Sequence, residues 1–402
     1  LVLGGLTEGV WPPLADPGPW LSRPMRARMK LPSLEALVGQ AAHDFTAAVC
    51  AAPAVVLSCP RRLDGAPAVP ARWLTRIDMF LAGRGEALPR HPASGWARQL
   101  DQPVALRPAP PPSPRPPVSR RPRRLSVTAI ETWLRDPYAI HARHILHLER
   151  LAEIEQDTDA ADYGSMVHAG LHRFLEEAAC GWPANARERL RAHLLRAMVD
   201  AGLRTALANW WAPRLERIAD WIAETETARR AGLAPSALST EVSGRWELRR
   251  QGGLFTLIGR ADRIERRPDG RLAILDYKTG AVPGQRLVDA GLAPQLPLEA
   301  AMARAGAFGP TVEGETAELA YWHITGGFMP GKVLALFKGD PAAIAEASRE
   351  AGAALGALID AFDDPARCYL SQPHPGRAPR FSDYAQLARV AEWAAADEGE
   401  EA

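Results

Sequence analysis

A proline-rich stretch divides the chain and limits what it can fold into. Positions 103 to 122 contain nine prolines in twenty residues. Because proline fixes φ and lacks a backbone N–H, such a stretch cannot build a helix or an interior strand and favours an extended, semi-rigid linker. We therefore expect a domain boundary here, with a Pro/Arg-rich linker over residues 101–124.

The size and charge of the chain set broad limits. Its 402 residues suggest two or three domains, and 47% hydrophobic with 24% charged residues is ordinary for a globular protein. The net charge of +1 steers no partner. The longest apolar runs are too short to span a bilayer, and no signal peptide is visible at Leu1. The missing initiator methionine indicates a fragment of a longer protein, which we expect to be cytoplasmic.

The cysteines and lysines are few. Four cysteines lie far apart without a CxxC pair, which argues against a disulfide framework and against a zinc ribbon. Lysine occurs only four times, and the other basic residues are arginines. A lysine inside a motif is therefore less easily explained by chance.

The apolar periodicity predicts an α/β pattern beyond the linker. We expect a first zone over 1–100, a second over 125–390 and a short acidic tail over 391–402. A helix begins after Ser126 or Thr128, either of which can cap it. Further helices are expected at about 162–180, onward to 229, at 293–306 and at 341–362, and strands at 239–250, 254–266, 271–277, 317–324 and 332–338. In the first zone, we expect a helix near 33–50 and a strand near 54–57.

One constellation in the second zone carries chemistry. Asp262 lies on one predicted strand, and Asp276 lies on the next, beyond a Pro-Asp-Gly turn. Lys278 follows two residues later, so it lies on the same face as Asp276. Paired carboxylates at a sheet end suit Mg²⁺, which would polarise a scissile phosphate and activate a water. Lys278 would orient that water or stabilise negative charge, and Gln295 could position the groups from the next helix.

Each residue also has a structural interpretation. Asp-x-Lys on a strand is commonly a solvated edge, and Asp262 between two arginines is commonly a surface ion pair. His168 on a helix could be a buried structural histidine, and Glu241 could be a surface carboxylate. The order Asp, turn, Asp-x-Lys, helix, Gln within a βββαβ pattern favours the functional interpretation.

Taken together, these motifs resemble a known family. Gly164-x-x-x-His168, Glu241, Gly259-Arg-Ala-Asp262, Asp276-Tyr-Lys278 and Gln295 are similar to the RecB-type branch of the PD-(D/E)XK nucleases over roughly 124–390. The first zone, with Leu3-Gly-Gly-Leu-Thr-Glu-Gly-Val-Trp-Pro and Ala41-Ala-His-Asp-Phe, resembles the end of the helicase-like part of the AddB family. So does the terminal run from Phe381 to Trp393.

The resemblance implies a fold and a set of roles. The fold would be a restriction-endonuclease-like core, a mixed sheet flanked by helices, preceded by the end of a RecA-like helicase-type domain. His168, Asp262, Asp276 and the Tyr277 carbonyl would bind Mg²⁺, with Mn²⁺ as a substitute. Lys278 would be the catalytic lysine, and Glu241 and Gln295 would support the active site.

Family relationships also imply a biological role. The domain would work with an AddA-type helicase–nuclease subunit on single strands and duplex ends of DNA. It would cut the 5′-terminated strand and leave a 3′ overhang for recombinational repair of double-strand breaks.

Two positions depart from the family pattern. Some members bind an iron–sulfur cluster through one cysteine before a Pro-Tyr pair and three near the C-terminus. Here Asp136 replaces the first, and Cys368 is the only cysteine near the end, so we predict no cluster. Glu299 stands where related nucleases often carry tyrosine, which weakens the expectation of a polar pair with Gln295.

The first zone lacks an arginine segment that would reach a γ-phosphate after the 33–50 helix, so we expect an inactivated helicase-like domain. Gly326-Gly-Phe-Met-Pro-Gly-Lys332 fits a phosphate-loop spacing, but Val333 and a strand follow it instead of Ser/Thr and a helix. We interpret it as a hairpin turn and predict no ATP site.

Two other features are ambiguous. Five arginines between Arg115 and Arg124 could contact DNA phosphates or could belong to a flexible charged linker. Tryptophans at 133, 210, 211 and 246 could stack on bases but more commonly belong to the core.

The sequence thus favours a Mg²⁺-dependent DNA nuclease domain of a repair helicase–nuclease subunit. Two alternatives are a free-standing RecB-type exonuclease and a catalytically silent clamp for DNA or a partner. The helicase-like first zone and the missing cluster cysteines count against the former, and the intact aspartates and lysine count against the latter.

Overall fold

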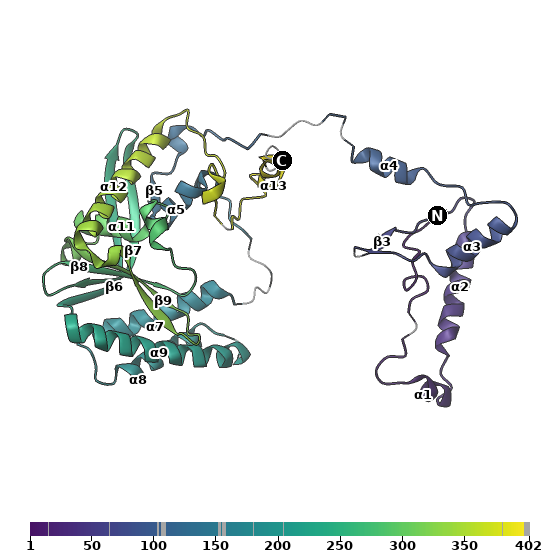
Figure 1. Cartoon of the computed structure of the whole chain (residues 1–402), viewed down its shortest axis with the longest axis horizontal. Helices are drawn as coiled ribbons and strands as arrows, with labels where there is room; N and C mark the ends of the chain where they lie inside the picture. Colours follow the sequence, from purple (N-terminus) through teal and green to yellow (C-terminus); the bar gives the residue numbers. More distant parts are fainter. Residues whose placement is uncertain are drawn as a thin grey trace. The chain divides into compact units, whose positions relative to one another are not determined.

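The computed structural model describes residues 1–397 except 15, 64, 103, 106–109, 152–153, 155–157, 180, 204 and 380. The chain forms two compact units, Leu1–Arg107 and Pro108–Ala402 (Figure 1). Among the described residues, no helix combines the length and apolar character needed to cross a membrane.

The first unit is small and held together by a helix packed on short strands. Its elements are β1 (Val2–Leu3), α1 (Arg23–Arg28), α2 (Leu34–Cys50), β2 (Val56–Leu57), β3 (Arg62–Leu63), β4 (Ala66–Pro67), α3 (Arg72–Gly83) and α4 (Ala93–Leu100). β1 and β2 pair in parallel, and α2 lies between them in the chain. Phe45 of α2 stacks on Trp73 of α3 with ring centroids 5.5 Å apart, and both belong to one apolar cluster. The expected helix at 33–50 is confirmed, and the expected strand near 54–57 is confined to β2.

The second unit is a mixed sheet between two groups of helices (Figure 1). Its strands are β5 (Arg124–Ser126), β6 (Ala237–Arg250), β7 (Gly253–Arg266), β8 (Leu272–Lys278), β9 (Thr316–Ile324) and β10 (Gly331–Ala335). Its helices are α5 (Val127–Arg135), α6 (Pro137–Ile140), α7 (Ala160–Ala178), α8 (Ala186–Asp200), α9 (Thr205–Leu233), α10 (Gln285–Asp289), α11 (Gln295–Arg304), α12 (Pro341–Asp363) and α13 (Val390–Asp397). The expected α/β fold with a central mixed sheet flanked by helices is therefore confirmed.

Two apolar cores, one on each face, hold the sheet between the helices. One core packs α5, α11 and α12 against the sheet, and the other packs α7, α8 and α9 against its opposite face. Residues 272 to 277 of β8 are all buried, as expected for a strand covered on both faces. The helices remove the apolar surface of each sheet face from water, which stabilises the fold.

β7 organises the sheet because it has three neighbours. β6 pairs with it antiparallel along its whole length, from Arg250↔Gly253 to Ala237↔Arg266. β5 pairs with residues 256–258 in parallel, and β8 pairs with residues 263–266 antiparallel. Because β6 occupies one edge of β7, β5 and β8 share the other edge. They run toward each other, and their C-terminal ends meet beside residues 259–262.

Two segments differ from the sequence-based expectation. The expected strand at 332–338 ends at Ala335, and a tight turn follows over Leu336–Gly339, in which Phe337 and Lys338 adopt φ of +53° and +52°. The acidic tail predicted over 391–402 overlaps a helix, α13, whose Trp393 indole donates to the carbonyl of Ala388 at 2.8 Å. Residues 398–402 lie outside the described residues.

The second half of the predicted linker is packed rather than flexible. The Arg121 guanidinium is buried and donates to five backbone carbonyls, those of residues 116, 362, 364, 365 and 367. Arg123 forms an ion pair with Asp363 at 2.6 Å. These two arginines fasten the segment to the end of α12, which argues against the flexible-linker alternative for them.

The Gly326–Lys332 segment is a hairpin, as expected. β9 and β10 pair antiparallel, with Ile324 opposite Gly331, and Gly326 adopts φ +64° in the turn between them. A strand, not a helix, follows the lysine.

Candidate active site

The sequence-predicted aspartates lie where β5 and β8 meet on the edge of β7. Asp262 follows Ala261 on β7 just beyond the last paired residue of this ladder, Arg263, which lies opposite Leu275. Asp276 is the next residue of β8. Because β7 and β8 separate here, backbone groups that would otherwise pair with each other across the two strands become available for a site.

Asp262 closes the separated end of the ladder. Its Oδ2 accepts a hydrogen bond from the backbone N–H of Tyr277 at 2.8 Å. Its Oδ1 lies 3.5 Å from Nδ1 of His168, which α7 supplies from the other side. The side chain is 14% exposed, so one carboxylate links β7, β8 and α7 in a largely desolvated position.

Asp276, Lys278 and Gln295 form one cluster, which the sequence predicted from three separate positions. Lys278 Nζ lies 2.8 Å from Oδ2 of Asp276 and donates to Oε1 of Gln295 at 3.1 Å. Gln295 Nε2 donates to Oδ1 of Asp276 at 2.6 Å. Gln295 reaches the cluster because it is the first residue of α11, which packs against β8 and β9.

Burial and neighbouring charges act in opposite directions on the pKa values of Asp276 and Lys278. Burial raises the pKa of Asp276 to about 6, with Asp262 adding to the rise and Lys278 opposing it. Burial alone would lower the pKa of Lys278, but the Asp276 carboxylate outweighs it and holds the pKa above its ordinary value. Lys278 therefore remains an ammonium group at neutral pH.

His168, Glu241 and Asp262 come together as a second group. Each offers one ligand atom, and these atoms lie within 4.8 Å of one another. Glu241 lies opposite Asp262 on β6, between the pairs Thr240↔Arg263 and Val242↔Ala261, and the exposed Arg260 pairs with it at 2.5 Å. Glu241 adopts φ +51°, a left-handed conformation that costs a non-glycine residue about 1–3 kcal/mol. Such strain is typical of a position held for function.

His168 is tuned by the same carboxylates. Burial alone would lower the pKa of its imidazole, but the hydrogen bond and the charge of Asp262, together with Asp276 and Glu241, raise it above its ordinary value. A cation placed among these groups would replace the proton as the partner of the carboxylates.

The donor set fits a divalent cation. Two carboxylates and an imidazole converge within ligand-to-ligand distance, and Asp276 adds a third carboxylate in the same cluster of charges. Carboxylate oxygens suit Mg²⁺, and Mn²⁺ also accepts a histidine nitrogen. The structure groups Glu241, predicted as a supporting residue, with His168 and Asp262, whereas the Asp276 side chain is directed to Lys278 and Gln295.

Tyr277 joins the site to a buried ion network beneath it. Its hydroxyl accepts from Arg263 at 2.9 Å, and Arg263 also pairs with Glu226 at 2.5 Å and with Glu265. All three charged side chains are almost fully buried. The Tyr277 carbonyl, predicted as a metal ligand by resemblance, stays a prediction.

Two acidic residues at the site were not assigned a role from the sequence. Glu299, which was noted only as a departure from the family pattern, is fully buried and accepts from Gln295 Nε2 at 3.2 Å. Burial raises its pKa well above the ordinary value, and the charge of Asp276 adds to the rise. Glu131 of α5 also lies within electrostatic reach of Lys278. The spacing of Gln295 and Glu299, one helical turn apart, was the signal for the first; nothing comparable marks Glu131.

The position expected for a first cluster cysteine has a structural role. Asp136 is buried, and its Oδ2 accepts a hydrogen bond from the Ser382 hydroxyl at 3.1 Å. This bond ties the segment after Pro379 to the end of α5. Cys50, Cys59 and Cys368 are free thiols, and Cys180 lies outside the described residues.

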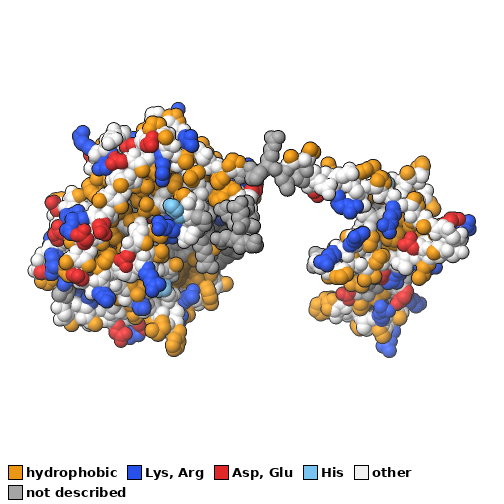
Figure 2. Space-filling view, turned by 45° about the horizontal axis from the view of Figure 1, so that its top comes forward, with side chains coloured by type: hydrophobic (Ala, Val, Ile, Leu, Met, Phe, Trp, Pro, Cys, Tyr) orange, Lys and Arg blue, Asp and Glu red, His pale blue; other side chains and the backbone are white. Residues whose placement is uncertain are grey.

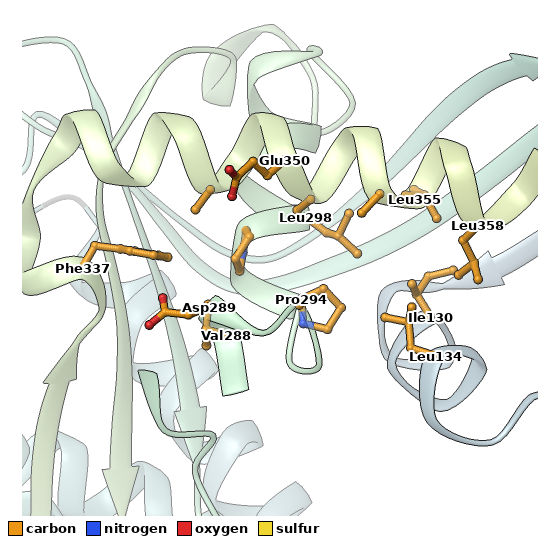
Figure 3. A pocket seen from close by; sticks show the side chains of 15 residues that line it. Ile130, Leu134, Val288, Asp289, Pro294, Leu298, Phe337, Glu350, Leu355 and Leu358 are labelled. Carbon is orange, nitrogen blue, oxygen red and sulfur yellow. The ribbon is translucent and has the colours of Figure 1, made fainter. Parts of the chain in front are cut away.

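The second unit also contains a separate cavity (Figure 3). It has a volume of about 250 Å³ and lies between α5, α10, the start of α11 and α12. Its walls are apolar except for Asp289 and Glu350. Pro294, Pro297 and Leu298 line it at the start of α11, whereas Gln295 and Glu299 are not among its lining residues, so the cavity is distinct from the Asp276–Lys278–Gln295 cluster.

Charge on the visible surface is mixed. On the face seen in Figure 2, arginine and lysine side chains alternate with aspartate and glutamate over both units. This agrees with the net charge of +1 and gives that face no single sign to attract a polyanion.

Comparison with known proteins identifies the family of the second unit. Residues 124–392 match the PD-(D/E)XK nuclease superfamily. An uncharacterized protein of Rickettsia conorii is 25% identical over 309 residues, which covers 75% of this chain and 35% of that protein. An uncharacterized protein of Rickettsia felis is 31% identical over 189 residues, 44% of this chain and 21% of the relative. The chain thus spans about a third or less of the curated relatives' own length. The crystal structure of SSO0001 aligns with 58% of this chain and 76% of its own at 13% identity, with a TM-score of 0.24.

Proposed function

Because the chain belongs to the PD-(D/E)XK nuclease superfamily, we propose that residues 125–390 form a Mg²⁺-dependent deoxyribonuclease that hydrolyses phosphodiester bonds. The observation that carries this proposal is the cluster of Asp276, Lys278 and Gln295 near the C-terminal end of β8, where His168, Glu241 and Asp262 also come together. A structural ion pair would need neither the histidine group nor the strained backbone of Glu241.

The roles of the residues follow from their contacts. His168, Glu241 and Asp262 would hold the cation, with Asp276 and the Tyr277 carbonyl as further ligands by resemblance. A bound Mg²⁺ supplies positive charge that polarises a phosphate oxygen and lowers the pKa of a water.

The Lys278 ammonium group has more hydrogen-bond donors than its contacts with Asp276 and Gln295 require. An ammonium group has three N–H donors, and Asp276 and Gln295 engage two of them. Among the described residues no further acceptor engages the third, which can orient an attacking water or donate to a phosphate oxygen as negative charge develops. Gln295 fixes the ammonium group by accepting from it while donating to Asp276.

We further propose that the chain is the C-terminal part of an AddB-type subunit. The resemblance of the first unit to the end of an inactivated helicase-like domain supports this, as does the order of motifs in the second unit. In that setting the nuclease would act as an exonuclease on the 5′-terminated strand, in a heterodimer with an AddA-type helicase–nuclease, during resection of double-strand breaks.

Cleavage of end-labelled single-stranded DNA tests the activity. We expect cutting by the wild-type chain with Mg²⁺ or Mn²⁺, none with EDTA, and a rate at least about 100-fold lower for Lys278→Ala. Arg349→Ala is the control, because Arg349 is an exposed cation on α12 that pairs only with Glu346 among the described residues. Equal rates for wild type and Lys278→Ala would contradict the assignment of the lysine.

The same experiment separates the alternatives. A folded chain that neither cuts DNA nor binds Mg²⁺ would favour a silent clamp. Activity that appears only when an AddA-type subunit is added would support the heterodimer. Full processive activity of the isolated chain would favour a free-standing exonuclease.

A further inference from the structure

The hairpin between β9 and β10 carries exposed apolar side chains that the proposed catalytic residues do not use. Phe328 is 99% exposed and Met329 is 74% exposed at its tip. Solvent-exposed apolar side chains that form a contiguous patch commonly mark a binding surface.

The hairpin is rigidly held despite its exposed tip. The Arg217 guanidinium of α9 donates to the carbonyls of Gly326 and Gly327 at 2.9 and 3.1 Å. A Cβ at Gly326 would lie 2.8 Å from the carbonyl oxygen of Arg214, and one at Gly331 would collide with Trp221. Glycines at these positions let the hairpin lie directly on α9.

An exposed tryptophan and a cation lie beside the hairpin on α9. Trp210 is 63% exposed, and the Arg214 guanidinium lies 5.0 Å from its ring centroid. The described residues include no carboxylate that pairs with Arg214. We call Trp210, Arg214, Phe328 and Met329 the hairpin surface.

The hairpin surface adjoins the proposed catalytic edge. β8 and β9 are parallel, with Lys278 opposite His323, and the hairpin begins at Thr325. Two strand residues rise about 7 Å, so the hairpin projects past the level of Lys278 on the neighbouring strand.

A second path leads from the catalytic edge to the same surface. A Cβ at Gly164 of α7 would lie 2.9 Å from Oγ1 of Thr279, the residue after Lys278. The preceding residue of α7 is Tyr163, and the Arg214 guanidinium carbon lies 5.9 Å from its ring centroid. Both paths therefore link the C-terminal end of β8, where Lys278 lies, to the hairpin surface through neighbouring residues.

We propose that the hairpin surface binds single-stranded DNA, with Trp210 and Phe328 stacking on bases of the strand that enters the catalytic edge. This rests on the proposed nuclease function. The chemistry fits this occupant, because single strands are bound by aromatic side chains that stack on bases together with cations that contact phosphates. Within duplex DNA the base faces are stacked on one another and are not available to these rings.

Binding in EDTA tests the proposal without depending on cleavage. Fluorescence anisotropy with a labelled oligothymidylate is measured for wild type, Trp210→Ala and Phe328→Ala, and then with an abasic oligonucleotide of equal length. We expect each substitution to weaken oligothymidylate binding at least about fivefold. Affinity for the abasic strand should be unchanged by either substitution, because it offers no bases to stack.

Trp20→Ala is the matched control, since Trp20 is an 86% exposed tryptophan of the first unit. Thermal unfolding verifies that the variants fold, as expected for exposed positions. Unchanged oligothymidylate affinity in both variants would overturn the proposal and leave the surface to a protein partner. An equal loss with the abasic strand would also overturn it. Base-dependent binding by a chain that cuts DNA neither alone nor with an AddA-type subunit would sustain the hairpin surface and reject the nuclease.

Discussion

The carboxylate of Asp262 accepts a hydrogen bond from the backbone N–H of Tyr277 at 2.8 Å, where β7 and β8 separate. One oxygen thus replaces the strand partner that Tyr277 has lost. The other lies 3.5 Å from His168 Nδ1. A single residue therefore combines a structural and a proposed metal-binding role, and the two can be separated by substitution.

Asp262→Asn should separate these roles. The amide oxygen can still accept from Tyr277, so the free energy of unfolding in EDTA should stay within about 1 kcal/mol of wild type. The increase in Tm that Mg²⁺ gives the wild type should be lost with the charge. Asp262→Ala should lose the stabilisation by Mg²⁺ and the hydrogen bond from Tyr277. It should lower the free energy of unfolding by about 1–3 kcal/mol, because the buried N–H is left without an acceptor. An Asn variant that Mg²⁺ stabilises as fully as wild type would rule out Asp262 as a ligand.

Glu299→Gln should change how stability depends on pH. Glu299 has its pKa raised by burial well above the ordinary 4.5, so the folded state holds a proton that the unfolded state releases. This proton stabilises the fold below about pH 4.5, and its contribution is lost as pH rises from there toward the raised pKa. In EDTA, the wild type should therefore lose stability relative to Glu299→Gln between pH 4.5 and neutrality.

Urea unfolding across that pH range measures the difference. Glu346→Gln, at an exposed glutamate, is the control and should follow wild type. Parallel pH profiles for wild type and Glu299→Gln would show that Glu299 keeps an ordinary pKa.

Two arginines on β7 should differ sharply in their contribution to stability. Arg263 is fully buried with Glu226 and Glu265, and Arg263→Ala would leave both carboxylates buried without this partner. We expect a loss of about 3–5 kcal/mol in urea unfolding. Arg260→Ala, which removes a 66% exposed side chain, should cost about 1 kcal/mol or less. Similar losses for the two variants would contradict the buried network.

Arg121 should stabilise the second unit far more than its neighbour Arg120. Arg121 donates to five carbonyls around the end of α12 and lies 5.7 Å from the Tyr369 ring centroid. Arg121→Ala should lower the free energy of unfolding by about 3 kcal/mol, because buried acceptors lose a charged donor. Arg120 is exposed, so Arg120→Ala should remain within about 0.5 kcal/mol of wild type. If both substitutions proved neutral, the segment would be a free linker after all.

Local sequence signals were sufficient for much of the fold. The Pro-Asp-Gly turn between β7 and β8, the Ser126 cap of α5 and the apolar runs of the strands depend on neighbouring residues alone, and the structure follows them. The Asp276–Lys278 pair was equally accessible, because the two-residue period of a strand puts both side chains on one face.

Residues distant in the chain needed the tertiary structure. The packing of Arg121 could not be predicted, because its acceptors are carbonyls about 240 residues away, which no local pattern encodes. Glu241 was given only a supporting role because its place opposite Asp262 depends on the register of β6 against β7. Glu131 reaches Lys278 because β5 and β8 share one edge of β7.

The sequence by itself determined the family, most element types and the residues proposed to carry the chemistry, because turn residues, periodicity and short motifs act over a few positions. The tertiary structure decided which of those residues meet. Strand register and helix packing place His168, Glu241 and Asp262 in one group and direct Asp276 to Lys278 and Gln295. Burial then sets their charges, since desolvation depends on everything packed around a group rather than on its neighbours in the chain.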